Sequence, residues 1–332
     1  MPTLAVETRR FALRETFTIS RGSRTHVTVV EVRLTDGGVT GRGECVPYPR
    51  YDETPEGVTA TIEAMRDALD GGLDRDALQE AMPAGAARNA LDLAFWDLEA
   101  RKAGTRVWEL PAYAALGGRQ PAPVPSCYTL SIDTPDRMRD AAARQSTRPL
   151  LKVKLGAGPE DMTRIAAVRD GAPDARLVID ANEGWSIADY EAHVPMLQTL
   201  GVELIEQPVH EKDDAALVGI AHPVPLCADE SCHTRASLDR LSGRYEIVNI
   251  KLDKTGGLTE ALALRKEAED RGFGVMVGCM MSSSLGVAPA VLVAGGAKIA
   301  DLDPPMLLGE DREPPLAVEG SSVSPPEPAL WG

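Results

Sequence analysis

From about residue 121 onward, the sequence repeats one pattern: a short apolar run, then a stretch with helical spacing such as 159–171, 186–201 or 258–272. This alternation predicts parallel strands with crossover helices, because parallel neighbours need a long connection. Eight such strands favour a closed barrel over an open doubly wound sheet, and no strand precedes a GxGxxG loop. The predicted strands lie at 125–130, 150–155, 176–181, 202–208, 225–230, 245–252, 273–280 and 298–303.

Residues 1–120 have a different pattern. Residues 26–38 alternate like a strand and end in an Asp-Gly-Gly turn. Residues 54–69 begin with Thr54, a good helix N-cap, followed by proline, and residues 87–101 carry apolar residues at helical spacing. The first part of the chain is therefore predicted to form a separate α+β unit.

Charged residues interrupt the apolar strands near their C-terminal ends. Four successive spacings of 26, 26, 23 and 22 residues match one strand–helix unit each, and a fifth of 50 spans two. Barrel active sites are built at the C-terminal ends of the strands, so we expect one polar site there. The residues are Lys154, Asp180, Glu206, Asp229, Lys251 and Asp301.

Three consecutive strands supply carboxylates: Asp180, Glu206 and Asp229. Converging carboxylates repel one another unless a cation lies between them. Ligation by oxygen alone, without His or Cys at these positions, favours Mg²⁺ over Zn²⁺. Unrelated surface salt bridges are the less favoured interpretation, because all three residues lie in apolar strands at one repeat.

Two lysines flank the carboxylates, Lys154 one strand before them and Lys251 one strand after. Around a barrel this places the lysines on opposite sides of a bound substrate, where one removes a proton and the other delivers one. Lys152 shares a strand face with Lys154, since residues two apart point the same way. Either Lys152 lowers the pKa of Lys154, or it balances the carboxylates; both interpretations stay open.

Composition excludes several classes of function. A net charge of −15 disfavours nucleic acid and anionic membrane surfaces as partners. The N-terminus shows no signal peptide, and no stretch has the length of a membrane span. An odd number of scattered cysteines predicts free thiols and a cytoplasmic location, and a metal site at Cys232-His233 lacks a second cluster. The cysteines are Cys45, Cys127, Cys227, Cys232 and Cys279.

The motifs "KVK", "DAN", "EQP", "ADES" and "NIKLDKTGG", in this order, resemble the enolase superfamily and its muconate-lactonizing-enzyme subgroup. The resemblance implies an α/β fold: a modified (β/α)7β TIM-like barrel over 121–309. It also implies an N-terminal α+β capping domain over 1–120, completed by C-terminal residues about 310–332. Lys154 and Lys251 would form the acid/base pair around an enediolate, with Asp180, Glu206 and Asp229 as Mg²⁺ ligands.

Asp301 and Asp303 form a D-x-D on one face of the eighth strand. An acidic pair suits a substrate ammonium and repels the acidic substrates of cycloisomerases. The pair, with "YPRY", "AGAARNALD" and "ADESCHTR", resembles the bacterial dipeptide epimerases, in particular the L-Ala-D/L-Glu epimerases. The resemblance implies epimerisation of a dipeptide such as L-Ala-L-Glu at the α-carbon of its C-terminal residue, in peptidoglycan peptide metabolism.

Further substrate contacts are predicted at three places. Arg24, or less favoured Arg21, lies in a cap loop and would bind the glutamate side chain, although loop arginines are often only solvated. Ser282 lies in the segment 278–286 expected to line the pocket, and Lys152 is placed among the substrate-binding residues.

Other functions stay open on the sequence alone. The same residues could catalyse succinylbenzoate-synthase-like elimination, cycloisomerisation or racemisation of an N-acylated amino acid. A catalytically silent barrel and a Schiff-base aldolase are less favoured, because both lysines and all three carboxylates are present. The expected partner is a small-molecule dipeptide; its exact identity stays open, as does the oligomeric state, for which a homo-oligomer is one option.

Overall fold

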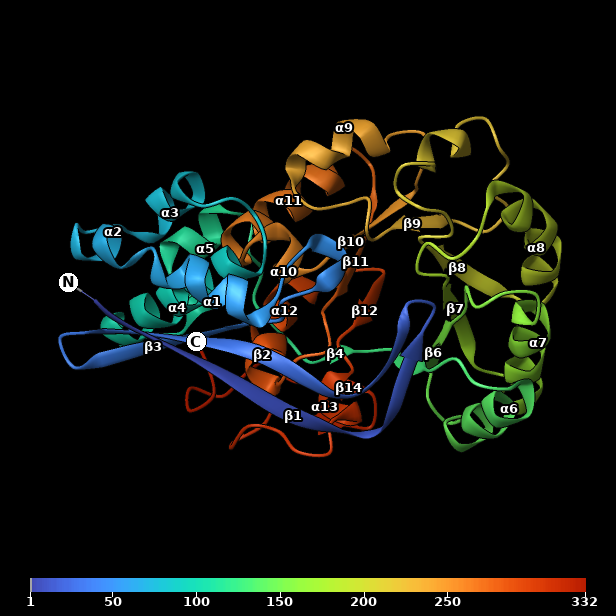
Figure 1. The fold of residues 1–332 in the computed structure, drawn as a ribbon, viewed down its shortest axis with the longest axis horizontal. Coiled ribbons are helices and arrows are strands. Elements are labelled where there is room, and N and C mark those ends of the chain that lie inside the picture. Colours follow the sequence, from blue (N-terminus) through green and yellow to red (C-terminus); the bar gives the residue numbers. More distant parts are fainter. Residues whose placement is uncertain (1) are drawn as a thin grey trace.

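The computed structural model describes residues 2–332. A barrel of parallel strands carries its helices on the outside, and an α+β unit formed by the N-terminal part packs against it (Figure 1). In this view the hairpin between β1 and β2, in blue, reaches from the N-terminal unit across to the barrel near β6. No helix among the described residues combines the length and the apolar character needed to cross a lipid bilayer.

The N-terminal unit is built on a three-stranded antiparallel sheet of order β1-β2-β3. Helix α4 lies against β3 so closely that a Cβ added at Gly43 would stand 2.0 Å from the Ala90 carbonyl oxygen. Its elements are β1 (Thr3–Ile19), β2 (Gly22–Asp36), β3 (Val39–Cys45), η1 (Pro49–Tyr51), α1 (Pro55–Glu63), α2 (Arg66–Asp70), α3 (Arg75–Ala81), α4 (Ala86–Ala103), η2 (Val107–Glu109) and α5 (Pro111–Ala115).

The helix predicted over 54–69 begins as expected but is not continuous. Thr54 accepts a hydrogen bond from the Gly57 amide and caps α1, whereas α1 ends at Glu63 and α2 starts at Arg66. A tight turn, in which the Met65 amide donates to Ile62 O, separates the two helices. Ile62 and Leu69, on either side of the break, are both buried in the same apolar core.

The barrel contains the eight predicted strands, in the sheet order β12-β11-β10-β9-β8-β7-β6-β5. The sheet closes where the Cys127 amide, next to β5, donates to Ala300 O of β12 at 2.9 Å. The strands are β5 (Tyr128–Leu130), β6 (Leu150–Lys154), β7 (Arg176–Asp180), β8 (Val202–Glu206), β9 (Leu226–Ala228), β10 (Ile247–Ile250), β11 (Gly274–Gly278) and β12 (Ile299–Asp301). The predicted TIM-like α/β barrel is confirmed.

Helices and a small second sheet complete the part of the chain that forms the barrel. Its helices are α6 (Pro135–Arg144), α7 (Asp161–Gly171), α8 (Ile187–Thr199), η3 (Asp214–Leu217), η4 (Arg235–Ser237), α9 (Leu238–Leu241), α10 (Leu252–Thr255), α11 (Leu258–Asp270), α12 (Ser284–Ala294) and α13 (Pro304–Leu307). A small sheet of order β13-β14-β4 lies beside it: β4 (Val124–Pro125), β13 (Val318–Glu319) and β14 (Ser322–Val323).

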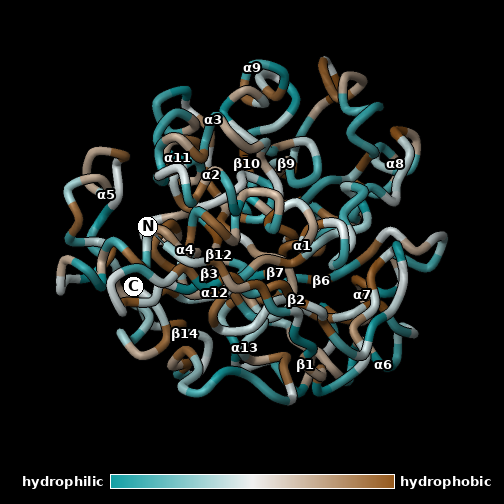
Figure 2. Tube along the Cα trace, turned by 60° about the vertical axis from the view of Figure 1, so that its left-hand side comes forward, coloured by the Kyte–Doolittle hydropathy of each residue, from teal (hydrophilic) through white to brown (hydrophobic). Residues whose placement is uncertain are grey.

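The barrel interior changes from apolar to charged along the strands. Leu150, Val178 and Leu204 belong to a buried apolar cluster inside the barrel, and hydrophobic segments, in brown, are prominent in the middle of the molecule (Figure 2). Strand side chains repeat with period two, so residues two and four positions further on point into the same interior nearer the C-terminal end. Lys152 and Lys154 follow Leu150 in this way, which explains how lysines enter an apolar strand.

The C-terminal segment returns to the N-terminal unit. Trp331 is fully buried and donates its indole N–H to Arg42 O at 2.9 Å. Arg312 forms buried ion pairs with Glu31 of β2 and Glu44 of β3. The division of the chain into a capping domain and a barrel domain near residue 120 stays a prediction.

Candidate active site

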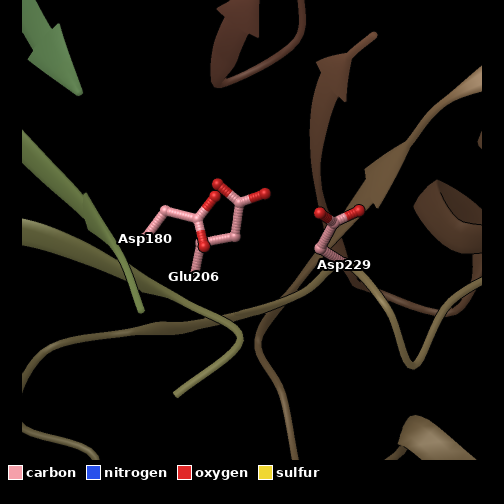
Figure 3. Close-up of side chains that lie close together, drawn as sticks. All are labelled: Asp180, Glu206 and Asp229. Carbon is pink, nitrogen blue, oxygen red and sulfur yellow. The ribbon is translucent and has the colours of Figure 1, made fainter. Parts of the chain in front are cut away.

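Three carboxylates meet where neighbouring strands end. Asp180 and Glu206 are the last residues of β7 and β8, and Asp229 directly follows β9. Figure 3 shows Asp180 and Glu206 beside each other, with Asp229 across from them. One oxygen from each side chain lies within 4.8 Å of the others, and all three residues are buried. The sequence-predicted ligand set is therefore brought together in space.

The two predicted acid/base lysines lie on either side of this cluster. Lys154 Nζ is 2.6 Å from Asp180 Oδ2, and Lys251 Nζ is 2.6 Å from Asp229 Oδ2. Their strands, β6 and β10, are four positions apart in an eight-stranded barrel, which places them on opposite sides. Both residues keep some exposure, 8% and 7%, at the surface of the central cavity.

Lys152 has a different environment, with an exposure of 0%. Its Nζ lies 2.7 Å from Asp301 Oδ2, 2.5 Å from Glu206 Oε2 and 3.2 Å from Asp180 Oδ2. These contacts favour the interpretation in which Lys152 balances carboxylates. Because Lys152 has no exposed surface, it does not contact a substrate directly. It affects the substrate only by positioning the carboxylates that it binds.

Burial and neighbouring charges shift the pKa values of the cluster residues in different directions. Burial raises the pKa of Asp180, but the ammonium groups of Lys154 and Lys152 outweigh it and hold that pKa below its usual value. For Glu206, burial and the charge of Asp180 together raise the pKa to about 7. Burial lowers the pKa of Lys251, but Asp229 outweighs it and the net shift is upward. Glu206 is therefore the one of these groups whose negative charge is least compensated by its surroundings.

Sequence reasoning missed a fourth buried lysine, Lys254. Its Nζ donates to Asp229 Oδ1 at 2.6 Å, to Asp229 O at 2.5 Å and to Asn249 O at 3.0 Å. Asn249 in turn donates its amide to Glu206 Oε1 at 2.7 Å. The motif "NIKLDK" contains Lys254, but nothing in the motif distinguishes a buried lysine from a solvated one.

The D-x-D residues lie beside this cluster, and their carboxylates are engaged differently. Asp301 accepts from Lys152 on Oδ2 and from the Cys127 thiol on Oδ1, at 3.1 Å. Asp303 accepts from the Thr129 amide on Oδ2, at 2.6 Å. Burial, followed by the charge of Asp301, raises the pKa of Asp303 to about 7. Asp303 thus has the freer carboxylate of the two.

The hairpin tip between β1 and β2 covers the cavity. Arg24 lines it with its guanidinium 5.9 Å from the Tyr48 ring centre, and forms no ion pair within residues 2–332. Arg21 instead pairs with Glu230 at 2.7 Å. The lining residues are Phe17, Ile19, Arg21, Arg24, Tyr48, Tyr51, Thr129, Lys154, Asn182, Asp229, Glu230, Lys251, Cys279, Met280, Met281, Asp301, Asp303 and Pro304.

The segment 278–286 contributes to this lining through Cys279, Met280 and Met281. Ser282 is buried with an exposure of 3%, and its hydroxyl has no hydrogen-bond partner among the described residues. It lies beneath the lining, close to Gly286. The predicted substrate contact of Ser282 is therefore not visible as a direct contact with the cavity.

Two family profiles match the chain in the order of its two parts. The N-terminal domain of mandelate racemase / muconate lactonizing enzyme matches residues 3–111, and the enolase C-terminal domain-like family matches residues 136–328. The chain belongs to the enolase superfamily. Its resemblance to that superfamily, predicted from the strand-end motifs, is thereby confirmed.

Curated members of the superfamily align along nearly the whole chain. An L-Ala-D/L-Glu epimerase of Escherichia coli K12 is 46% identical over 95% of this chain and 97% of its own length. An N-acetyl-D-glutamate racemase of a Pseudoalteromonas species is 42% identical over 92% of this chain and 95% of its own.

Solved superfamily structures are similar as well. One from Agrobacterium tumefaciens, described as having homology to dipeptide epimerases and holding sodium and L-Ala-L-Glu, is 52% identical with a TM-score of 0.96 over 100% of both chains. A dipeptide epimerase of Enterococcus faecalis, complexed with Mg and L-Leu-L-Tyr, is 30% identical with a TM-score of 0.87 over 98% of this chain and 96% of that one. At the level of the superfamily, the predicted isomerase and the predicted magnesium cofactor are confirmed.

Proposed function

We propose that this protein epimerises a dipeptide at the α-carbon of its C-terminal residue, interconverting L-Ala-L-Glu and L-Ala-D-Glu. The observation that carries the proposal is the placement of Lys154 and Lys251 on opposite sides of one carboxylate cluster, with Asp303 beside it. Relatives named as dipeptide epimerases support the substrate class.

Inversion of a carbon centre needs two groups on opposite faces. The neutral amine of one lysine takes the α-proton, and the C–H electron pair stays on the substrate, delocalised into its carboxylate. The ammonium of the other lysine then donates a proton to the opposite face, which removes the additional negative charge and restores the substrate carboxylate. After one turnover the two lysines have exchanged protonation states, so the same residues serve the reverse direction.

The residues of the cluster fit a divalent cation. Asp180, Glu206 and Asp229 offer three buried carboxylate oxygens, and Glu206 Oε2 accepts no hydrogen bond of normal geometry although Lys152 is near. Bound Mg²⁺ would stabilise the negative charge that develops on the substrate carboxylate. Lys152 and Lys254 hold these ligands in place from beneath.

Two further residues would bind the charged groups of the substrate that lie away from the α-carbon. The free oxygen of Asp303 faces the cavity and suits the ammonium of the N-terminal residue. Arg24, without an ion pair of its own, suits the side-chain carboxylate of a glutamate. Arg21 is less suited, since Glu230 already occupies its guanidinium.

Racemisation of an N-acylated amino acid is the second candidate, favoured by the racemase relative. Such a substrate has no ammonium and would leave Asp303 without a partner. A buried carboxyl whose pKa is about 7 can also be neutral, and then it could donate to an acyl oxygen. Elimination and cycloisomerisation have no comparable support from the site.

The test is α-proton exchange in D₂O with Mg²⁺, followed by ¹H NMR on a panel of L-Ala-L-Xaa dipeptides and N-acetyl-L-glutamate. We expect deuterium incorporation and inversion for L-Ala-L-Glu, and at least about tenfold slower turnover of N-acetyl-L-glutamate. Faster turnover of the acetylated substrate would assign the second function instead. No exchange in any substrate would contradict both.

We further propose a cytoplasmic location. The support is chemical: all five cysteines are free thiols in the structure, as expected for a reducing compartment. Metabolism of peptides derived from peptidoglycan would fit the proposed substrate pair.

A further inference from the structure

The tip of the β1–β2 hairpin, residues 17–24, is a small ribbon of its own above the cavity. The register of the two strands is interrupted between Ala12 and Phe17, and the tip beyond that point holds only the pairs from Phe17↔Arg24 to Ile19↔Gly22. A two-stranded ribbon of this size is marginally stable at best in water. Contacts with the barrel must therefore fix its position.

Two groups of contacts do this: Thr18 pairs through its backbone with Ser131 and Ile132 after β5, and Arg21 binds at the far end of the ribbon. Its Nη2 donates to Glu230 Oε1 at 2.7 Å and to the Tyr48 hydroxyl at 2.9 Å, and its Nη1 donates to Asn182 O at 3.0 Å. The neighbouring Ser20 hydroxyl also donates to Asn182 O, at 3.2 Å. One guanidinium thus joins the hairpin to the loops after β7 and β9 and to the segment that carries Tyr48.

The barrel side of this contact is preformed. Glu230 is only 1% exposed, so its carboxylate depends on a partner for its charge. Asn182 and Glu183 both adopt left-handed backbone conformations, with φ of 44° and 65°. Such conformations are costly for residues other than glycine and persist where the surrounding structure holds them. The result here is a carbonyl of Asn182 that faces the hairpin.

We propose that Arg21 is a positioning residue: it anchors the hairpin tip over the cavity and thereby places Phe17, Ile19 and Arg24 against the substrate. The consequence for catalysis rests on the proposed function, whereas the anchoring itself does not. Arg21 differs from Arg24 in this respect: both line the cavity, but among residues 2–332 only Arg21 of the two forms ion pairs with the barrel.

Hydrogen–deuterium exchange of the Mg²⁺-loaded protein tests the anchor without any substrate. In Arg21→Ala we expect the amides of residues 17–24 to exchange at least about tenfold faster, while those of the barrel strands stay as slow as in the unaltered protein. Arg24→Ala is the matched control on the same ribbon and should leave the exchange of the tip unchanged. Tyr48→Phe, which removes one of the hydrogen bonds, should give a smaller acceleration.

Kinetics then separate an anchor from a substrate-binding residue. Arg21→Ala should raise KM for L-Ala-L-Glu and L-Ala-L-Leu by the same factor, about ten- to a hundredfold. When the tip is open for most of the time, the binding-competent fraction of the protein falls, and this weakens binding of every substrate equally. Its kcat should fall less. Arg24→Ala should weaken only the acidic dipeptide.

Arg21→Ala leaves the Glu230 charge buried without its partner, so the double variant Arg21→Ala/Glu230→Gln provides a check. It should recover the melting temperature and still show fast exchange at the tip. Unchanged exchange in Arg21→Ala, recovery of slow exchange in the double variant, or a loss confined to acidic dipeptides would each overturn the proposal. If no dipeptide is turned over at all, the proposed function fails, and the exchange experiment still decides the anchor.

Discussion

The carboxylate cluster is held from two sides by two pairs of lysines, and the two pairs are built differently. On the β6 side Lys152 lies beneath Lys154, and on the β10 side Lys254 lies beneath Lys251. In each pair the outer lysine lies 2.6 Å from one ligand carboxylate and lines the cavity. The outer lysines are alike; the inner ones are not.

Lys152 contacts only side-chain carboxylates, and these come from three strands, including Asp301 of the D-x-D. Lys254 contacts one carboxylate and two backbone carbonyls within its own part of the barrel. The β6 side therefore links the ligand cluster to the proposed ammonium site, whereas the β10 side is a local support for Asp229. This contrast predicts that changes on the β6 side spread further than changes on the β10 side.

The largest effect should follow from removing what both sides share, the ligands themselves. Asp180→Asn, Glu206→Gln and Asp229→Asn should each lower turnover by several orders of magnitude, since the cation would lose a ligand. Mg²⁺ at about a hundred times its Kd should stabilise the unaltered protein by about 2.7 kcal/mol, and these variants by much less. Thermal unfolding with and without Mg²⁺ measures this. Full activity of any variant after exhaustive EDTA dialysis would contradict the metal assignment.

Removal of either outer lysine should lower the epimerisation rate to a similar extent, but the two variants should differ in which epimer still exchanges its α-proton. Lys154→Ala and Lys251→Ala should each lower epimerisation by about 10²–10⁴, the usual loss for an acid/base group. Each variant should still exchange the α-proton of one epimer, because the remaining lysine reaches its own face. ¹H NMR in D₂O on L-Ala-L-Glu and L-Ala-D-Glu distinguishes them. Exchange of the same epimer in both variants would rule out the two-face mechanism.

Much of this arrangement could be predicted from the sequence because it is periodic. A strand–helix unit of about the same length recurs, so the charged residues at the strand ends are predicted to lie at the same end of the barrel. The motifs around them then indicated the superfamily. Lys254 was missed because a lysine on a short helix resembles a solvated one. Its burial depends on the Asn249 carbonyl and on Asp229, and no local pattern shows this.

Other features depend on contacts between distant parts of the chain. Cys127 meets Asp301 across 174 positions only because the first barrel strand closes on the last. The pairing of Arg21 with Glu230 depends on how the hairpin lies over the barrel, which spacing along the sequence does not encode. The break of the helix near Met65 has no glycine or proline at that position to predict it.

The two aspartates of the D-x-D should have different roles, because only Asp301 contacts Lys152 on the β6 side. Asp303→Asn should weaken binding of dipeptides with a free amine by about 1.5–3 kcal/mol, roughly tenfold to a hundredfold, and spare their N-acetylated analogues. Asp301→Asn should impair both substrates and Mg²⁺ affinity, because Asp301 holds Lys152 next to Glu206 and Asp180. Inhibition constants for both substrate types, with Mg²⁺ titrations, make the comparison. Identical profiles for the two variants would remove the distinction.

The smallest effect should come from the second partner of Asp301, the Cys127 thiol. It donates to Oδ1 at 3.1 Å while Lys152 holds Oδ2, so it orients a carboxylate that is already fixed in charge. A neutral hydrogen bond contributes about 0.5–1.5 kcal/mol, and a thiol is a weak donor, so Cys127→Ala should lower kcat/KM about two- to fivefold. Cys127→Ser keeps a donor and should restore most of it.

Cys227→Ala is the control for the methyl-sized space that Cys127→Ala leaves behind. Both thiols belong to the same buried apolar cluster inside the barrel, but Cys227 has no contact with Asp301. Equal losses of kcat/KM in the two alanine variants would therefore assign the effect to packing. A loss confined to Cys127→Ala, and rescued by serine, would show that the hydrogen bond from the weaker partner of Asp301 affects turnover of the substrate. Cys127, which lies next to β5 where the barrel closes, would then belong to the group of residues on the β6 side that affect catalysis.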